Sequence, residues 1–255
     1  MVRYEVEKPR ATITIDDPER RNPLSTTTMA ELVACTKRAV DDDQVRVIVY
    51  TGAGDQAFSA GGDLASGFVD DAVGLHASRG AMADLIRAMW RAGKPTVARV
   101  NGHALAGGFG LAVACDITIA ADDIKLGMPE IKVGLWPMMI TVPVQRAMGL
   151  KPALELMMTG RLIGATEAQA LGAVSRVVPR ARLDAEVDEM VAALAAQSSA
   201  VMMLGRDAFY GVVGLGYDAA LDRLQTGLTE VALTSDSQEG IRAFMEKRDP
   251  VWLGR

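Results

Sequence analysis

The stretch Asn101-Gly102-His103-Ala104-Leu105-Ala106-Gly107-Gly108-Phe109-Gly110 contains four glycines between two apolar segments. Residues 95–100 (PTVARV) predict a short buried strand, and residues 111–115 (LAVAC) continue into an apolar helix. A strand that runs through glycines into a helix leaves backbone N–H groups unpaired at the helix N-terminus, where the helix dipole favours negative charge. We interpret the stretch as half of an oxyanion hole. On spacing alone, close helix–strand packing that needs small residues remains an open alternative.

Two further stretches accompany it, residues 56–64 (QAFSAGGDL) and residues 126–137 (LGMPEIKVGLWP). In this order and at these separations, the three stretches resemble the signature of the enoyl-CoA hydratase/isomerase family, also called the crotonase superfamily. The resemblance runs from residues 22–24 (NPL) to residues 244–248 (FMEKR), which is nearly the whole chain.

The pattern of apolar segments predicts an α/β fold. Apolar strands at residues 11–15, 45–51 and 117–120 alternate with helices over short links, which is typical of stacked strand–turn–helix units. The resemblance implies a crotonase-like spiral of β-β-α units. We expect that spiral in residues 1–195, and a C-terminal helical region in residues 196–255. In the family such a region builds homotrimers, often stacked as homohexamers, and helps to close the site.

Composition narrows the functional classes. The 255 residues are 49% hydrophobic and 23% charged, as in ordinary soluble proteins, and the net charge of −5 gives no general support for a nucleic-acid partner. Two cysteines, Cys35 and Cys115, make no disulfide framework, so a reducing compartment is expected. The N-terminus has no apolar signal core and no apolar run reaches the length of a membrane span. We expect a cytoplasmic enzyme without a membrane or nucleic-acid partner.

The resemblance assigns the chemistry to three positions. A thioester loses its α-proton only if charge on the developing enolate oxygen is stabilised, and two fixed N–H donors do this well. By resemblance the donors are the backbone N–H groups of Ala60 and Gly107, and the acid/base is Glu130. From the residues alone, apolar neighbours of Glu130 such as Leu126 and Trp136 would desolvate its carboxylate and raise its proton affinity. Without the resemblance, an exposed loop glutamate would be the preferred interpretation, because glutamates are commonly exposed.

The sequence departs from the hydratase pattern at Gly110, where hydratases of the family carry a second glutamate. One carboxylate suffices to move a proton between two carbons, so the departure favours double-bond isomerisation of an enoyl-CoA. Weak hydration remains possible, as does a non-enzymatic CoA-binding homologue. We expect Gly110 to leave a space for a water, a bulkier substrate or, less plausibly, the carboxylate of Asp70 or Asp71.

The substrate is expected to be an acyl-CoA thioester, with CoA as part of the substrate and no separate cofactor. The contacts that the resemblance implies, or that we expect beside them, are Arg20, Asn22, Leu24, Ala60, Gly61, Gly62, Asp63, Leu64, Gly107, Trp136, Phe244 and Lys247. Of these, Asp63 is expected to fix its loop. Phe244 and Lys247 are expected to reach the CoA nucleotide across a subunit boundary.

Other chemistries fit less well. Residues 52–57 (GAGDQA) follow a strand as a dinucleotide fingerprint does, but no helical pattern begins on those glycines. Two histidines, His76 and His103, cannot form a multi-histidine metal site, so no metal is expected.

Overall fold

A computed structural model describes residues 1–63 and 72–254. Its largest sheet has six strands, and all of its neighbouring pairs except β1–β2 are parallel. In spatial order they are β1 (Val2–Glu7), β2 (Arg10–Ile15), β4 (Val47–Gly52), β7 (Thr96–Val100), β9 (Ile117–Ala121) and β12 (Arg176–Val178). All six residues of β4 are buried, as a strand covered on both faces requires.

Two smaller sheets complete the β structure. One has the order β11 (Leu162–Gly164), β10 (Lys125–Gly127), β8 (His103–Leu105) and β5 (Ala57–Ser59). The other pairs β3 (Pro23–Leu24) with β6 (Gly61–Gly62). Within the four-stranded sheet β5, β8 and β10 are parallel, and β11 is antiparallel to β10.

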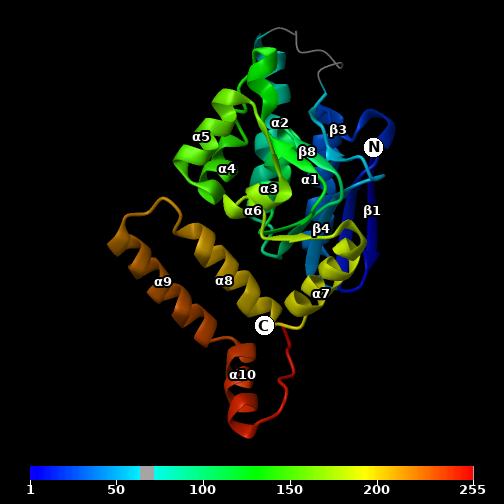
Figure 1. The fold of residues 1–255 in the computed structure, drawn as a ribbon. Helices are drawn as coiled ribbons and strands as arrows, with labels where there is room; N and C mark the ends of the chain where they lie inside the picture. Colours follow the sequence, from blue (N-terminus) through cyan, green and yellow to red (C-terminus); the bar gives the residue numbers. More distant parts are fainter. Residues whose placement is uncertain (64–71, 255) are drawn as a thin grey trace.

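Ten α-helices are described, and Figure 1 shows them around and below the sheets. They are α1 (Thr26–Asp41), α2 (Ala72–Trp90), α3 (Gly107–Ala114), α4 (Thr141–Met148), α5 (Leu150–Thr159), α6 (Ala165–Ala170), α7 (Leu183–Ala195), α8 (Ser199–Gly211), α9 (Tyr217–Ala232) and α10 (Ser235–Glu246). The described residues also form 3₁₀ helices at Pro18–Arg20, Pro129–Val133 and Arg180–Arg182.

The chain repeats one supersecondary unit. β4, β7 and β9 each enter the large sheet, β5, β8 and β10 follow in the small sheet, and α2, α3 and α4 close the successive units. This arrangement confirms the predicted spiral of β-β-α units. The glycine-rich turn after β4 leads into β5 and not into a helix, so the rejection of a dinucleotide fingerprint is also confirmed.

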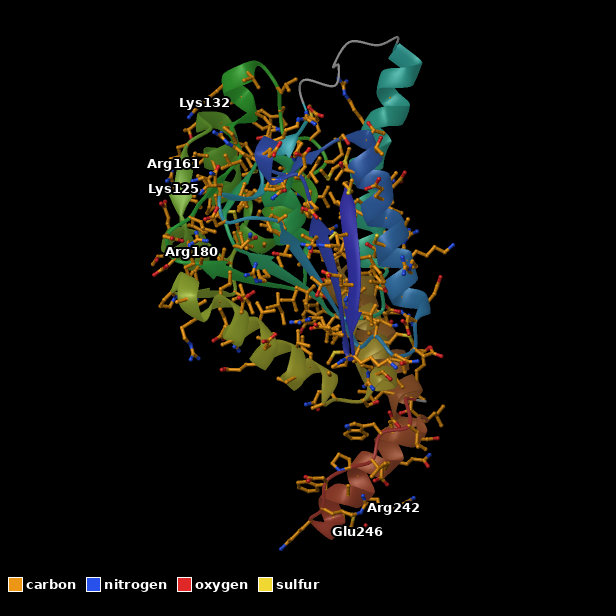
Figure 2. All side chains as sticks on the ribbon, turned by 90° about the vertical axis from the view of Figure 1, so that its right-hand side faces the viewer. Lys125, Lys132, Arg161, Arg180, Arg242 and Glu246 are labelled. Atoms are coloured by element: carbon orange, nitrogen blue, oxygen red, sulfur yellow. The ribbon has the colours of Figure 1, made fainter. Side chains whose placement is uncertain are left out.

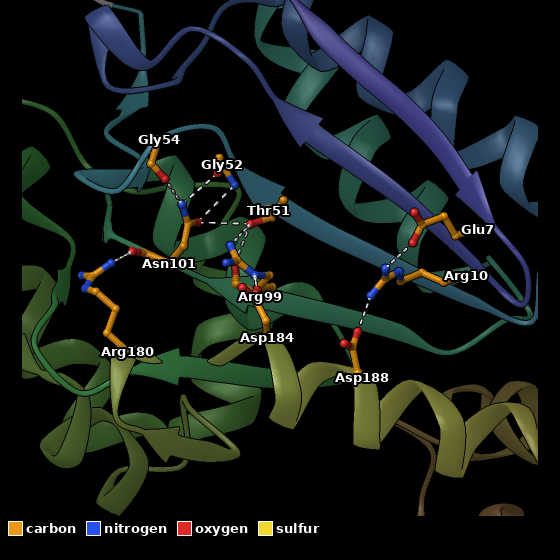
Figure 3. Close-up of polar contacts among 10 residues, drawn as sticks. All are labelled: Glu7, Arg10, Thr51, Gly52, Gly54, Arg99, Asn101, Arg180, Asp184 and Asp188. Atoms are coloured by element: carbon orange, nitrogen blue, oxygen red, sulfur yellow. Dashed lines mark hydrogen bonds and ion pairs between the residues drawn. The ribbon is translucent and has the colours of Figure 1, made fainter. Parts of the chain in front are cut away.

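Asn101 fixes the start of the glycine-rich stretch to the preceding unit. Its side-chain Nδ2 donates to the carbonyl oxygens of Gly52 at 2.8 Å and Gly54 at 2.6 Å, and its Oδ1 accepts from Thr51 Oγ1 at 3.1 Å. Figure 3 shows these contacts, together with Arg180 donating to the Asn101 carbonyl. The amide therefore joins the end of β7 to the turn between β4 and β5.

The helices α9 and α10 stand apart from the sheets in Figure 1, and residues 249–254 return from α10 to the junction of α7 and α8. The division at residues 195 and 196 stays a prediction. Among the described residues no single helix is long and apolar enough to cross a membrane. The segments 180–195 and 199–211 reach that composition only as a pair bent by 101°.

A buried ion pair anchors α8 to the core. Arg206 Nε donates to Asp116 Oδ2 at 2.9 Å, and its other nitrogens donate to the carbonyl oxygens of Met89 and Trp90. The same Asp116 carboxylate accepts hydrogen bonds from Thr96 and Tyr210. Because the Arg206 side chain is only 6% exposed, loss of the guanidinium leaves buried acceptors unpaired.

We predict that Arg206→Met lowers the free energy of unfolding by about 3–5 kcal/mol, the usual cost of removing one partner of a buried ion pair. Arg223→Met is the matched control, because Arg223 on α9 lies 4.0 Å from Glu230 in an exposed pair and should cost less than about 1 kcal/mol. Urea denaturation at fixed protein concentration measures both variants. Equal losses in the two would contradict an anchoring role for Arg206.

Candidate active site

The functional parts of the three sequence motifs follow strands that end at the same edge of the four-stranded sheet. β5, β8 and β10 are neighbouring parallel strands, so their carboxyl ends meet at one edge. Gly61 and Gly62 follow β5, Gly107 follows β8, and Glu130 follows β10. The sheet thus brings together segments that are 20 to 70 residues apart in the chain.

Hydrogen bonds bring the second and third motifs close to each other. The Ala106 N–H donates to the Gly127 carbonyl at 2.8 Å. Ala106 is one residue before Gly107, and Gly127 is three residues before Glu130. Ala106 has φ 51° and ψ −127°, a conformation that L residues rarely adopt. Such a conformation persists only where surrounding contacts impose it, and it is found most often near functional sites.

Gly107 begins α3, and a Cβ on it would face two flexible side-chain ends and, at 3.8 Å, the Gly61 Cα. A Cβ built on Gly107 would lie 3.0 Å from Met82 Cε and 3.4 Å from Leu24 Cδ1. As the first residue of the helix, its N–H has no partner within the helix. Leu24 and Met82 therefore border the approach to a helix N-terminus that favours negative charge. Met82 is not among the site residues expected from the sequence, because no motif there distinguishes it from an ordinary core residue.

Ala60 does not have a free N–H. Its backbone nitrogen donates to the Arg21 carbonyl at 2.9 Å. Arg21 itself has a left-handed backbone with φ 62°. The N–H of Ala60 is therefore already engaged, and the prediction that it faces the substrate is wrong. The two-residue strand β6 pairs with β3 in a register that the sequence pattern does not reveal.

Gly62 is better placed than Ala60. Asp63 donates its N–H to the Leu24 carbonyl at 3.4 Å, so the N–H of the preceding residue points to the opposite side of the strand. A Cβ on Gly62 would meet nothing within 4 Å, and the residue is exposed. Its neighbour Gly61 lies against Gly107, because a Cβ on Gly61 would be 3.0 Å from the Gly107 nitrogen.

Glu130 lies in the 3₁₀ helix that follows β10, with a half-buried side chain. Its Oε2 atom is buried and has no hydrogen-bond partner among the described residues. Desolvation raises the pKa of the Glu130 carboxyl above its usual value, and a hydrogen bond with its own backbone offsets this in part. A carboxylate with one buried oxygen that lacks a partner can exchange a proton with a ligand.

Other predicted residues hold the loops of the site in place. Arg20 Nη2 lies 2.9 Å from both carboxylate oxygens of Asp63, which ties the two loops together, so Asp63 fixes a loop as expected. The Asn22 side chain is fully buried and donates to the carbonyl oxygens of Ala53 and Ala57. It therefore supports the site from inside the protein, and its amide is not presented to a ligand.

The structure does not bring every predicted contact together. Trp136 is half-buried against the core, and its contact with an acyl group stays a prediction. Leu64, Asp70 and Asp71 lie outside the described residues. Figure 2 shows Arg242 and Glu246 of α10 at the opposite end of the molecule from Lys132. Lys132 is two residues after Glu130 and so marks the side of the molecule on which the site lies. Phe244 and Lys247 are within two residues of Glu246, so they are remote from the site of their own chain.

The space expected at Gly110 is absent. A Cβ on Gly110 would lie 2.0 Å from Ile140 Cγ2 and 2.3 Å from Ile140 Cβ, well inside van der Waals contact. Ile140 is itself only 3% exposed. The expectation that this position holds a water, a bulkier substrate or another carboxylate is wrong, because Ile140 fills it.

Comparison with known proteins agrees with this geometry. The family model described as Enoyl-CoA hydratase/isomerase matches residues 6–255. A Thermus thermophilus protein provisionally named an enoyl-CoA hydratase is 37% identical over 245 residues, covering 94% of this chain and 96% of that protein. Carnitinyl-CoA dehydratase of Escherichia coli K12 is 34% identical over 249 residues, covering 95% and 94%.

Solved structures extend the likeness to the whole fold. The crystal structure of an enoyl-CoA hydratase from Bacillus anthracis superposes with a TM-score of 0.94 at 28% identity, covering 100% of this chain and 99% of that chain. With the family model matched over nearly the full length, the chain belongs to the enoyl-CoA hydratase/isomerase family of acyl-CoA enzymes and has the crotonase fold.

Proposed function

We propose that this protein moves a double bond in an enoyl-CoA thioester from the 3-position to the 2-position, with Glu130 as its single acid/base. The observation that carries the proposal is the Glu130 carboxylate, whose buried Oε2 lacks a partner among the described residues. Position 110, where a hydratase of the family has its second glutamate, is a glycine packed against Ile140.

The proposed reaction needs only one proton carrier. Ionised Glu130 takes a proton from C2 of the 3-enoyl thioester, and the electron pair of that C–H bond moves through the thioester onto its oxygen. The same carboxyl group then returns a proton to C4, and the double bond comes to lie between C2 and C3. No water or electron acceptor is consumed, so the proposed reaction requires no metal or redox cofactor, and CoA is part of the substrate.

We assign the oxyanion donors to the N–H groups of Gly62 and Gly107. A Cβ on Gly62 would meet nothing within 4 Å, and one on Gly107 would come closer than 3.5 Å only to the side-chain ends of Met82 and Leu24; the two loops are in contact through Gly61. Backbone donors held by a sheet and a helix need little reorganisation as charge develops on the oxygen. Removal of one such donor typically costs about a hundred- to a thousand-fold in rate.

Hydration of a 2-enoyl-CoA is the second candidate. It is favoured by the names of the relatives, which include enoyl-CoA hydratase and carnitinyl-CoA dehydratase. Hydration adds a whole water across the double bond, whereas isomerisation leaves the atoms of the substrate unchanged. The two reactions therefore differ in the mass of the product.

We also propose a homotrimer or homohexamer. Apolar side chains on α9 and α10 are exposed in the single chain, including Leu228 at 70% and Phe244 at 85%. Exposed apolar residues in this number are typical of a surface that another subunit covers. A neighbouring subunit would also supply the Phe244 and Lys247 that a single chain keeps away from its own site.

We predict that 3-enoyl-CoA incubated with the enzyme in heavy water becomes 2-enoyl-CoA, with exchanged deuterium but without the mass of an added water. Mass spectrometry of 2-enoyl and 3-enoyl thioesters measures this. Glu130→Gln should lower the rate by about a hundred- to ten-thousand-fold, the usual contribution of a general acid/base. Glu189→Gln, on an exposed part of α7, is the matched control and should leave the rate unchanged.

A product that gains a full water, with no isomer formed, would support the hydratase instead. If CoA thioesters bind but neither exchange protons nor change mass, the proposed reaction is wrong. A Glu130→Gln variant with wild-type activity would remove Glu130 from the mechanism.

The raised pKa of Glu130 predicts opposite effects on activity and stability. The rate should fall as the pH drops through a pKa above the usual 4.5, because the base becomes protonated.

At neutral pH the folded state holds a desolvated Glu130 carboxylate that the unfolded chain hydrates, so Glu130→Gln should raise the urea midpoint. Below about pH 4 both states of the wild type are protonated, and this gain should disappear. A Gln variant that is less stable than wild type at pH 7 would contradict the desolvation.

For the oligomer, light scattering should give three or six times the mass of the chain, and Leu228→Asp should shift the protein toward smaller species by burying a charge in the contact. Ser237→Asp, on α10, is the charge-matched control. A monomer of wild-type protein would contradict the proposed assembly.

A further inference from the structure

Ile140 packs directly on Gly110, the position at which hydratases of the family carry their second glutamate. A Cβ on Gly110 would lie 2.0 Å from Ile140 Cγ2, 2.3 Å from Cβ and 3.2 Å from Cδ1. Real Cβ atoms essentially never approach other heavy atoms closer than 3.0 Å. The isoleucine side chain therefore stands directly on the Gly110 backbone, where any longer side chain would have to begin.

Ile140 cannot easily move out of the way. The closest overlaps involve its Cβ and a branched methyl group next to the backbone, and β-branched side chains have few alternative rotamers. Its backbone is held on both sides, because Thr141 N donates to the Pro137 carbonyl at 3.1 Å and Val144 N donates to the Ile140 carbonyl at 3.1 Å. A side chain at position 110 would require this whole segment to shift.

The contact belongs to the side of α3 that faces the site. Gly107 and Gly110 are three residues apart in one helix, so they lie on the same face, and Gly107 carries the N–H that we assign to the oxyanion hole. A buried water needs two to four polar partners. The Ile140 side chain is apolar and offers none.

We propose that Ile140 determines the reaction specificity: packed on Gly110, it keeps a second carboxylate and a reactive water out of the site and so restricts the enzyme to moving a proton within its substrate. This inference rests on the proposed function for its chemical meaning, but its steric basis does not depend on activity. It makes Ile140 a specificity-determining residue that need not touch the reacting atoms.

The steric basis is tested by a double-mutant cycle on thermal stability. Gly110→Ala should lower the melting temperature by about 5 °C or more while Ile140 is present, since overpacking a core is costly. In an Ile140→Gly background, which also removes the Cβ that would lie 2.3 Å away, the same change should be nearly neutral. Gly205→Ala in α8, where a Cβ meets nothing within 4 Å, is the control and should cost little. Equal effects of Gly110→Ala in both backgrounds would overturn the proposal.

The chemical part is tested by putting the acid back. The double variant Gly110→Glu with Ile140→Gly should raise the ratio of hydration to isomerisation at least about tenfold over Gly110→Gln with Ile140→Gly, which has the same shape without the acid. Uptake of labelled oxygen from water into 2-enoyl-CoA measures hydration. An unchanged ratio in a folded, CoA-binding variant would overturn the proposal. If the glutamate variant does not fold, the melting-temperature cycle decides.

Failure of this inference and failure of the proposed function are distinguishable. Wild-type protein that hydrates 2-enoyl-CoA and forms no isomer contradicts the proposed function and the specificity assigned to Ile140. A wild type that isomerises, combined with no coupling between positions 110 and 140, contradicts only the inference about Ile140.

Discussion

The parallel pairing of β8 between β5 and β10 is the constraint on which the site depends. These strands contribute only three residues each, yet their shared edge brings Gly62, Gly107 and Glu130 into one region. Asn101 supports the pairing from outside the sheet, because its amide joins the end of β7 to the turn that precedes β5. A change in the register of β8 by one residue would reverse which groups face the substrate.

The site divides its tasks between backbone and side chains. Polar side chains such as Asn22 and Asp63 hold loops, while the groups that we propose for contact with the substrate are backbone N–H donors and one desolvated carboxylate. This division suits a thioester enolate, whose charge develops on a single oxygen and whose proton needs only one carrier. The cost is a Glu130 carboxylate that is less stable in the folded protein than in water, a common feature of catalytic groups.

Much of this could be predicted from local patterns, and the exceptions have a common cause. The helix after Gly107, the alternation of strands and helices and the desolvation of Glu130 follow from residues adjacent in sequence. The engaged N–H of Ala60 and the filled space at Gly110 follow from contacts with Arg21 and Ile140, which lie 39 and 30 residues away. A glycine looks the same in sequence whether it leaves room for a ligand, as at Gly62, or for an isoleucine, as at Gly110.

The central claim is that one thioester oxygen lies between two backbone donors with Glu130 beside the carbon that loses its proton. A crystal structure with an unreactive acyl-CoA analogue tests this most directly. We expect a carbonyl oxygen within about 2.7–3.2 Å of the backbone nitrogens of both Gly62 and Gly107, with the Glu130 carboxylate in contact with C2. A carbonyl oxygen bound away from either nitrogen, or a Glu130 carboxylate turned away from C2, would contradict it.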